Sequence, residues 1–363
     1  MNIFISINHP AHVHYFRNFI RLMEERGHHF IVTNRDSPMI NQLLDFYQIA
    51  HTTGRERKKN RSTLKVLYTL SKNVRNMVRM SRRDHVDFYV GFGSASCALT
   101  SFVTRKPCVL VDDTDHNLKN QTIYLPFCSR VFTPFYFNSK LFKYKWAKRK
   151  QENLQAYVEQ FYLHSKYYHP DSSILDTLGL TSQDYVIVRF SAFDASHDKG
   201  IQSLDVETRK SLICLLEQKY RVVLSLEAPT DDAFFKERLL TFPPHRMHDL
   251  LYHARMIVTE GATMASEAYV LGVPYLYLNP IKCGNINHQC SQSPERARQS
   301  TDAKEVLTIV KELMETAVDQ QACRAEVEGS TICPTDYLTW FVENYPSSKR
   351  TIKKNSDYQL RFR

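Results

Sequence analysis

The residues whose types and spacing best suit chemistry lie in segment 259–274, which reads TEGATMASEAYVLGVP. Short apolar strands are predicted on both sides of it, with one helix between them. Gly261 permits a tight turn, and Thr263, Ser266 and Glu267 follow in the first turns of the helix. Hydroxyls and backbone N–H groups at a helix N-terminus suit a diphosphate, and a carboxylate one turn further suits a ribose. The alternative is an ordinary βαβ crossover built from small residues.

The same helix needs a stop and a buried face. Gly272 is expected to end it in a left-handed conformation, and Pro274 prevents its continuation. Met264, Ala268 and Leu271 are spaced i, i+4 and i+7, which predicts that they form its buried stripe.

A second polar segment, 8–16, follows the first predicted strand at residues 3–7. His12 falls in the first turn of the helix predicted from about residue 12 to 26, where the helix dipole favours a neutral imidazole. We therefore expect His12 to be a base or an acceptor-orienting residue, with Asn8 and His14 as substrate contacts. The alternative is that the histidines here cap and pack the helix.

Acidic residues follow another predicted strand, 108–111. Asp112 and Asp113 would line the crevice that forms at the carboxyl ends of parallel strands. Two carboxylates so close would raise the pKa of one of them, as a general base requires. Acceptor binding, catalysis, a metal site and a plain acidic turn all stay open from the residues alone.

Segment 259–274 resembles the donor-binding motif of GT-B glycosyltransferases, close to that of MurG and of the non-hydrolysing UDP-N-acetylglucosamine 2-epimerases. Segments 8–16 and 157–164 resemble strings of an uncharacterised bacterial family of MurG-like glycosyltransferases. The resemblance implies that Ser266 faces the diphosphate, that Glu267 holds the ribose and that His12 lies in the cleft. Met264 stands where that motif usually has a hydroxyl, next to Thr263.

The resemblance also implies an α/β fold of GT-B type, with two facing doubly wound, Rossmann-like parallel-sheet domains and an interdomain cleft. The expected division is an acceptor domain at 1–160, a nucleotide-sugar donor domain at 161–340, and the end of a crossing helix with a basic tail at 341–363. The tail is expected to be loose at its end. In the donor domain, Arg189 near the end of the strand predicted at 185–190, and Ser191 and His197 in the turn that follows, are candidate phosphate contacts.

Length and composition indicate the number of domains and the class of protein. The 363 residues suit two domains, and 43% apolar residues can build real cores. The eight cysteines form no C-x-x-C pair, which favours reduced packing residues. No apolar run reaches the roughly 18 residues of a membrane span, and the chain starts directly as a strand, so we expect a cytoplasmic protein.

The net charge of +10 favours an anionic partner. Basic strings at 55–83 and 140–150 interleave with apolar residues. We expect them to contact an anionic membrane surface at the inner face of the cytoplasmic membrane rather than nucleic acid, since no RNA-binding signature accompanies them.

The function that the resemblance implies is transfer of a sugar from a nucleotide-sugar, expected to be UDP-linked, to a glycan or lipid-linked acceptor in cell-surface polysaccharide synthesis. No cofactor is expected, and a divalent cation is compatible with Asp112 and Asp113 but not required. Two alternatives stay open: a UDP-sugar 2-epimerase-like enzyme and a non-catalytic nucleotide-sugar-binding protein.

Overall fold

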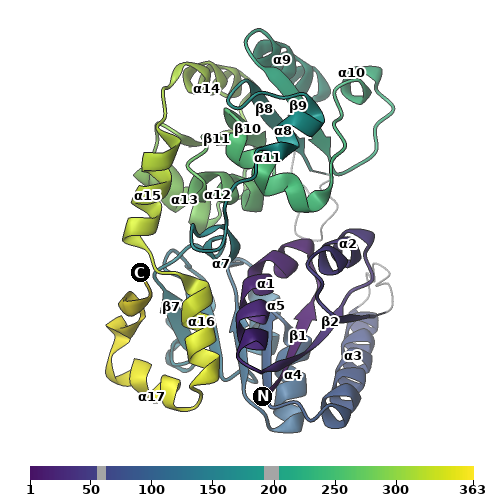
Figure 1. Ribbon diagram of the computed structural model, residues 1–363, viewed down its shortest axis with the longest axis vertical. Helices are drawn as coiled ribbons and strands as arrows, with labels where there is room; N and C mark the ends of the chain where they lie inside the picture. The colour runs from purple at the N-terminus through teal and green to yellow at the C-terminus, as the bar shows by residue number, and fades with distance from the viewer. Residues whose placement is uncertain (55–62, 192–203) are drawn as a thin grey trace. The chain divides into compact units, whose positions relative to one another are not determined.

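The chain folds around two parallel β-sheets, each in its own unit, as the computed structural model shows (Figure 1). The structure describes residues 1–54, 63–191 and 204–363. Unit 1 comprises Met1–Tyr167 and Ser330–Arg363, and unit 2 comprises Tyr168–Gly329. The first unit extends to Tyr167 rather than to residue 160. The chain returns to this unit at Ser330, before helix α16 (Pro334–Glu343), rather than staying in the second unit to residue 340. The predicted fold class, two Rossmann-like parallel-sheet domains, is confirmed.

The sheet of unit 1 has the strand order β3-β2-β1-β4-β5-β6-β7. Its strands are β1 (Asn2–Ile7), β2 (His29–Asn34), β3 (His51–Thr53), β4 (Phe88–Phe92), β5 (Cys108–Val111), β6 (Arg130–Pro134) and β7 (Gln151–Leu154). All neighbours pair in parallel. The central strands are short apolar runs because side chains on both of their faces are buried, as in β5, where every residue is inaccessible to solvent.

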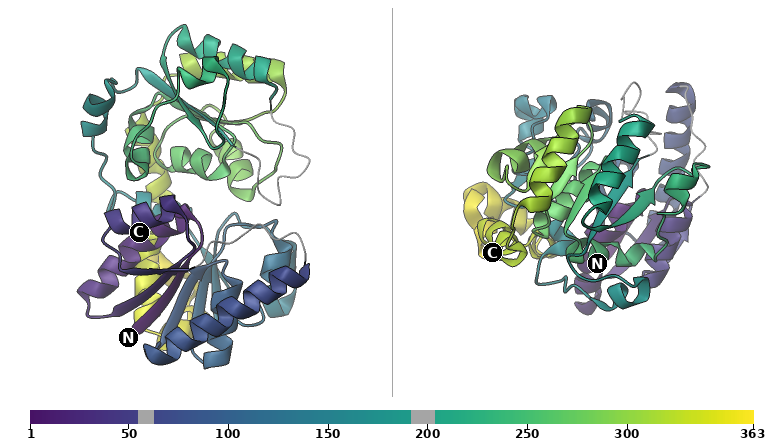
Figure 2. Two further views of the ribbon diagram at one scale, coloured as in Figure 1. Left: turned by 90° about the vertical axis from the view of Figure 1, so that its right-hand side faces the viewer. Right: turned by 90° about the horizontal axis from the view of Figure 1, so that it is seen from above.

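Helices cover both faces of this sheet (Figure 2). They are α1 (Pro10–Glu25), α2 (Pro38–Phe46), α3 (Thr63–Arg83), α4 (Ala95–Thr104), α5 (Leu118–Tyr124), η1 (Lys140–Lys143), α6 (Lys145–Lys148), α7 (Gln160–Leu163), α16 (Pro334–Glu343), α17 (Ser347–Lys354) and η3 (Ser356–Phe362). Successive residues of β6 show the two layers. Val131 belongs to the core under α3 to α6, whereas the Phe132 ring contacts Tyr337 and Phe341 of α16.

The C-terminal tail is helical and packed, which corrects the expectation of a loose end. The ring of Tyr358 in η3 stacks on Trp340 of α16 with centroids 4.5 Å apart. The N–H of Cys333 donates to the carbonyl of Phe362 at 2.6 Å. Aromatic residues at spaced positions in the tail therefore find partners on α16, although the segment reads as polar and basic.

Unit 2 has the strand order β12-β11-β10-β8-β9. Its strands are β8 (Tyr185–Phe190), β9 (Arg221–Leu226), β10 (Met256–Thr259), β11 (Tyr275–Tyr277) and β12 (Ala297–Gln299), and all pairs are parallel. Its helices are α8 (Ser173–Leu178), α9 (Val206–Glu217), α10 (Ala233–Lys236), η2 (Pro244–Arg246), α11 (Met247–His253), α12 (Ala262–Val270), α13 (Gly284–Gln292), α14 (Ala303–Glu315) and α15 (Gln320–Ser330). Residues of α9 and α14 pack in one core cluster with β8, β9 and β10.

Gly272 ends α12 as the sequence predicts, with φ of +77°. A Cβ at this position would lie 2.2 Å from the carbonyl oxygen of Gln320 in α15. The glycine is therefore required twice, once by its backbone conformation and once by the close approach of a second helix.

We predict that Gly272→Ala lowers the free energy of unfolding by about 2–4 kcal/mol, from the left-handed conformation and the overlap with backbone. Denaturant unfolding of the purified variant measures this. Gly329→Ala is the matched control, because a Cβ there meets no atom within 4 Å. Equal stabilities for the two variants would contradict the account.

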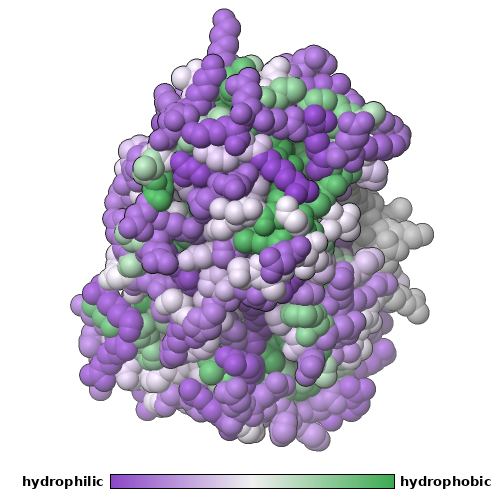
Figure 3. Space-filling model, turned by 45° about the horizontal axis from the view of Figure 1, so that its top comes forward, coloured by the Kyte–Doolittle hydropathy of each residue, from purple (hydrophilic) through white to green (hydrophobic). Residues whose placement is uncertain are grey.

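The surface of the described chain is largely polar, with smaller apolar areas between hydrophilic side chains, as the face in Figure 3 shows. None of the helices that the structure describes has the length and apolarity needed to cross a membrane.

Candidate functional site

Helix α12 begins directly after β10, between the two neighbours of that strand, β8 and β11. Gly261 is its N-cap and supplies no side-chain cap. The N–H of Gly261 is held by the hydroxyl of Thr259 at 3.0 Å, which fixes the turn. Residues 261–264 are partly exposed, whereas the helix from Ala265 onward is buried. The accessible part of the motif is thus its first turn, where N–H groups and the helix dipole favour an anion.

The two other chemical groups of the motif lie deeper in unit 2. Ser266 is fully buried and accepts a hydrogen bond from the Gln289 amide at 2.8 Å. Glu267 is buried beside His248, with its Oε1 3.0 Å from the His248 Nε2. Each side chain is therefore held in one orientation by a neighbour on another helix. Their predicted contacts with diphosphate and ribose stay predictions.

The predicted buried stripe of α12 needs one correction. Met264 is partly exposed, whereas Ala268 and Leu271 of the predicted stripe are fully buried. Residues 284–292 form helix α13, and Gln289 of this helix turns inward to Ser266 and Tyr275. A helix forms because Ile286 and Gln289, three apart, share its buried face.

The end of β8 carries two of the predicted phosphate contacts. The guanidinium of Arg189 donates to the Ser225 hydroxyl and the Glu227 carboxylate, both at 2.8 Å, so this side chain is directed toward β9. Ser191 is partly buried, and its N–H donates to the carboxylate of Glu260 at 2.7 Å. His197 lies outside the described residues.

Glu260 is a candidate that sequence reasoning missed. It is nearly fully buried at the end of β10, and its second oxygen pairs with Arg209 of α9 at 2.8 Å. One carboxylate thus ties the turn after β8 to the turn before α12. The signal available in the sequence was its position, an acidic residue between a buried strand and Gly261.

In unit 1 the predicted residues follow two strands, β1 and β5, which lie on either side of β4. Register places Ser6 of β1 beside Gly91 of β4, and Phe92 beside Val111 of β5. The residues that follow these strands, Asn8 and Asp112 among them, therefore meet at one edge of the sheet.

His12 lies in the first turn of α1, partly buried, with its ring 5.0 Å from that of Phe92. Desolvation by burial, helped by His9, lowers the pKa of His12 to about 3, so its imidazole is neutral at physiological pH. The Asn8 N–H donates to its Nδ1 at 3.4 Å. The remaining proton is then on Nε2, which makes His12 a hydrogen-bond donor rather than a base.

The neighbouring polar residues have different surroundings. Asn8 is exposed, and its side-chain amide donates a hydrogen bond to the Ser6 hydroxyl at 3.3 Å. His14 is buried between the rings of Tyr47 and Tyr162, with centroids 5.9 and 5.4 Å away. His14 therefore contacts other residues than His12 does, and its predicted substrate contact remains a prediction.

Asp112 and Asp113 have clearly different environments. Asp112 is buried, and it accepts hydrogen bonds from the Tyr124 hydroxyl and from the N–H of Thr114. Burial raises the pKa of Asp112 to about 7 and that of Asp113 to about 6. Asp113 is the more accessible of the two and accepts from the Thr114 hydroxyl at 3.0 Å. The pair offers one accessible carboxylate with a pKa suited to proton transfer near neutral pH.

Tyr136, which follows β6, is a second residue that the sequence reasoning missed. Burial raises the pKa of its phenol well above the usual range, and the nearby carboxylates of Glu159 and Asp113 add to this. Tyr136 thus remains protonated beside Asp113. Its only sequence signal was an aromatic residue two positions after a strand.

Groups of three or more histidine, cysteine or acidic side chains arranged to hold a metal ion do not occur among the described residues. That the reaction requires no metal ion therefore stays a prediction.

Comparison with known proteins gives the family. The family described as "Protein of unknown function (DUF354)" matches residues 1–338. The chain belongs to this family. The uncharacterized protein MJ0665 of Methanocaldococcus jannaschii is 21% identical to it over 322 residues, which cover 86% of this chain and 91% of that protein.

Solved structures share the fold of this DUF354 protein. The UDP-GlcNAc 2-epimerase of Neisseria meningitidis bound to UDP-GlcNAc aligns with a TM-score of 0.68 at 12% identity, over 94% of this chain and 99% of that one. The UDP-N-acetylglucosamine 2-epimerase of Rickettsia bellii gives 0.65 at 13%, over 98% and 99%. A glycotransferase of kitacinnamycin gives 0.60 at 12%, over 94% and 98%. At these identities the likeness establishes the fold and leaves the chemistry to the site.

Proposed function

We propose that the protein is a glycosyltransferase that moves a sugar from a nucleotide-sugar, UDP-linked, to a glycan or lipid-linked acceptor in cell-surface polysaccharide synthesis. The observation that carries the proposal is the first turn of α12. It is open, lacks a side-chain cap and directs N–H groups outward at the carboxyl end of β10. Sugar nucleotides present a diphosphate that such a turn binds.

Unit 2 is the proposed donor domain. The turn at Gly261–Met264 would bind the diphosphate, and Glu267, oriented by His248, would accept hydrogen bonds from the ribose. Fold neighbours whose structures contain UDP or UDP-GlcNAc support this choice of ligand.

Unit 1 is the proposed acceptor domain. In the reaction, the acceptor oxygen forms a bond to the anomeric carbon while the bond from that carbon to the diphosphate breaks. Asp113 takes the proton of the acceptor hydroxyl, because its pKa of about 6 leaves it ionised yet basic near neutral pH. His12 donates a hydrogen bond from Nε2 to orient the acceptor, and the helix end of α12 stabilises the departing diphosphate.

A UDP-sugar 2-epimerase is the second candidate, favoured by the solved epimerases that share the fold. The two reactions can be distinguished by the substrates that each requires. An epimerase changes the sugar configuration when UDP-GlcNAc is supplied alone, whereas a transferase needs an acceptor. Proton NMR of the purified protein with UDP-GlcNAc as the only substrate reads this directly, and accumulation of the C2 epimer would replace our proposal.

The first test is a thermal-shift panel of nucleotides and nucleotide-sugars. A ligand present at 100 times its Kd stabilises the folded state by about 2.7 kcal/mol, which is a readily measured shift. We expect UDP-sugars to stabilise the protein more than free sugars or adenine nucleotides. A protein stabilised by none of them is not a nucleotide-sugar enzyme, whether catalytic or sensing.

We predict that Glu267→Ala weakens UDP binding about tenfold or more, because hydrogen bonds to a charged group are lost. Isothermal calorimetry of the folded variant measures the change. Glu315→Ala, which removes an exposed carboxylate of the same unit, is the control. An unchanged Kd in Glu267→Ala would remove this residue from the donor site.

A further inference from the structure

Large apolar side chains are exposed on the helix layer of unit 1 that α4, α5 and α6 build. The exposed fraction is 63% for Phe102, 48% for Val103, 60% for Tyr144 and 46% for Trp146, and Ile123 is exposed as well. Inward-facing residues of the same helices belong to the core below, so these five are not misplaced core residues. We call them the aromatic-basic face, together with the cations described next.

These residues form one surface rather than scattered positions. The ring of Phe102, near the end of α4, contacts that of Phe127 at 5.1 Å. Lys150 donates to the carbonyls of Leu125 and Pro126, both at 2.7 Å, and so fixes the Phe127 loop beside the segment that follows α6. These contacts therefore link α4, α5 and α6 to one another on the outer side of the helix layer.

Positive charge predominates on this face. Exposed cations accompany the apolar residues, namely Arg105, Lys106, Lys119, Lys143, Lys145 and Lys148. Between Ala95 and Lys150 the only carboxylates are Asp112, Asp113 and Asp115, which follow β5 at the edge of the sheet where the candidate site lies. Anionic groups would therefore meet attraction with little opposing charge.

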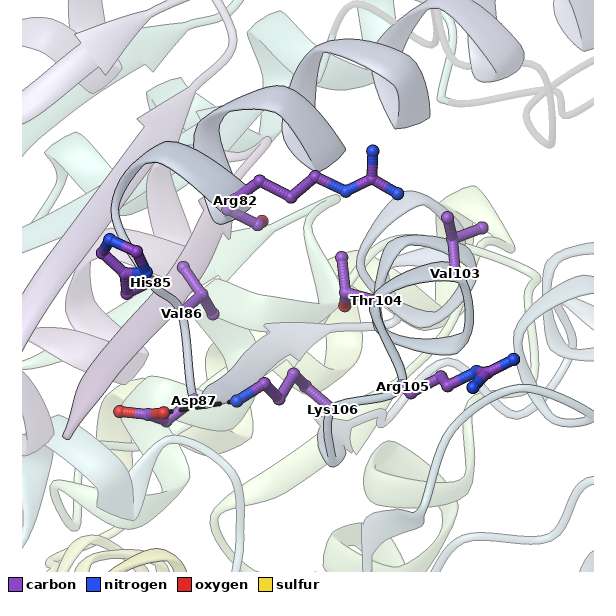
Figure 4. Close-up of a pocket in the computed structure, with 9 residues that line it drawn as sticks. Arg82, His85, Val86, Asp87, Val103, Thr104, Arg105 and Lys106 are labelled. Atoms are coloured by element: carbon purple, nitrogen blue, oxygen red, sulfur yellow. Dashed lines mark hydrogen bonds and ion pairs between the residues drawn. The ribbon is translucent and has the colours of Figure 1, made fainter.

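A hollow of about 510 Å³ adjoins the face at the opposite, amino edge of the sheet (Figure 4). Arg82, Val103, Arg105 and Lys106 line it. Lys106 is 3.4 Å from Asp87, while Figure 4 shows the guanidinium groups of Arg82 and Arg105 directed away from that pair. The hollow thus places arginines next to an exposed apolar pair, Phe102 and Val103, at the end of α4.

The apolar side chains decide which anionic partner fits. Tyrosine and tryptophan occupy the headgroup level of membranes, and aliphatic side chains enter the acyl boundary beneath it. Val103 and Ile123 have no ring to stack on a nucleobase, which a single-strand binding surface would use. We infer that the aromatic-basic face docks unit 1 on an anionic lipid bilayer.

The inference stands on unit 1 alone and is independent of the proposed function. The lipid contact predicted for the two basic strings is thereby assigned to the aromatic-basic face. Of the two predicted basic strings, 140–150 lies on the face. Residues 55–62 are outside the described structure, and the rest of the first string forms α3, whose Arg82 lines the hollow. Helices α4 and α5 contribute residues that no sequence pattern had indicated.

Tryptophan emission gives a direct test. The chain has two tryptophans, Trp146 on the face and Trp340 stacked on Tyr358. In the full-length Trp340→Phe variant only Trp146 reports. Vesicles of equal parts phosphatidylglycerol and phosphatidylcholine should shift its emission to shorter wavelength at physiological salt, and pure phosphatidylcholine should not. Absence of a shift with the anionic vesicles overturns the inference.

Vesicle co-sedimentation with paired variants tests the surface itself. Lys145→Glu with Lys148→Glu should weaken partitioning roughly 30-fold or more, since each basic residue contributes about 1 kcal/mol, or about fivefold, near an anionic surface. The control reverses Lys304 and Lys311 of α14 in unit 2, an equal change in charge outside the face, and should keep most of the binding. Equal losses in both pairs would reduce the effect to net charge and overturn the inference.

A second variant separates insertion from simple attraction. Phe102→Ser with Val103→Ser keeps every charge and should reduce partitioning about tenfold or more, from lost apolar burial. Full binding by this variant, or tighter binding of single-stranded RNA than of vesicles by the wild type, would contradict a lipid-docking face.

Discussion

Asp113→Asn should lower kcat about 10²- to 10⁴-fold, the usual contribution of a general base. The asparagine keeps the size and the hydrogen bond from Thr114, so the fold should be unaffected. Initial rates of sugar transfer from the nucleotide-sugar found in the thermal-shift panel measure the change. Asp115→Asn is the control in the same turn, and we expect it to retain most of the activity.

The pH dependence identifies the base. A carboxyl group whose pKa is raised to about 6 is protonated below that pH and cannot accept a proton. Wild-type kcat should therefore fall as the pH drops through about 6, and this limb should vanish in Asp113→Asn. A variant with normal turnover and an unchanged acid limb would show that the acceptor is activated elsewhere.

His12→Gln should lower kcat about 10²- to 10³-fold, on the scale of removing one hydrogen-bond donor aimed at developing charge. The neutral Nε2–H of His12 is the group lost, since its Nδ1 is occupied by the Asn8 N–H. Because burial holds the pKa of His12 at about 3, the acid limb near pH 6 should survive in this variant. Donor affinity should stay near the wild-type value.

This prediction separates two roles for the same imidazole. Loss of the acid limb together with activity in His12→Gln would make His12 the base and contradict its assignment as a donor. His29→Gln, at an exposed position that begins β2, is the control for general effects of replacing a histidine. Full turnover in His12→Gln would leave the histidine with a packing role against Phe92.

Sequence reasoning located the elements whose signals are local. The apolar strands, the helix after Gly261 and its end at Gly272 lie where the patterns predict, because buried parallel strands are continuous apolar runs and a left-handed helix end needs glycine. Strands β7 and β12 lack such a signal. Both are at sheet edges, and their mostly polar residues carry no such run.

Side-chain partners from distant segments were decided only by the tertiary structure. Nothing in the order of residues shows that Gln289 bonds to Ser266, that His248 faces Glu267, or that Glu260 joins two turns. The polar tail shows the same limit, since its tyrosine and phenylalanine pack only because α16 presents Trp340 to them.

For the candidate site, the sequence by itself determined which residues follow the strands of the two sheets, because the carboxyl ends of parallel strands must share one edge. It could not divide the roles among His12, Asp112 and Asp113. Those roles depend on pKa, and pKa depends on how far each group is removed from water and on what it bonds to. Only the folded chain buries Asp112 against Tyr124, leaves Asp113 accessible and places the Asn8 N–H at the Nδ1 of His12.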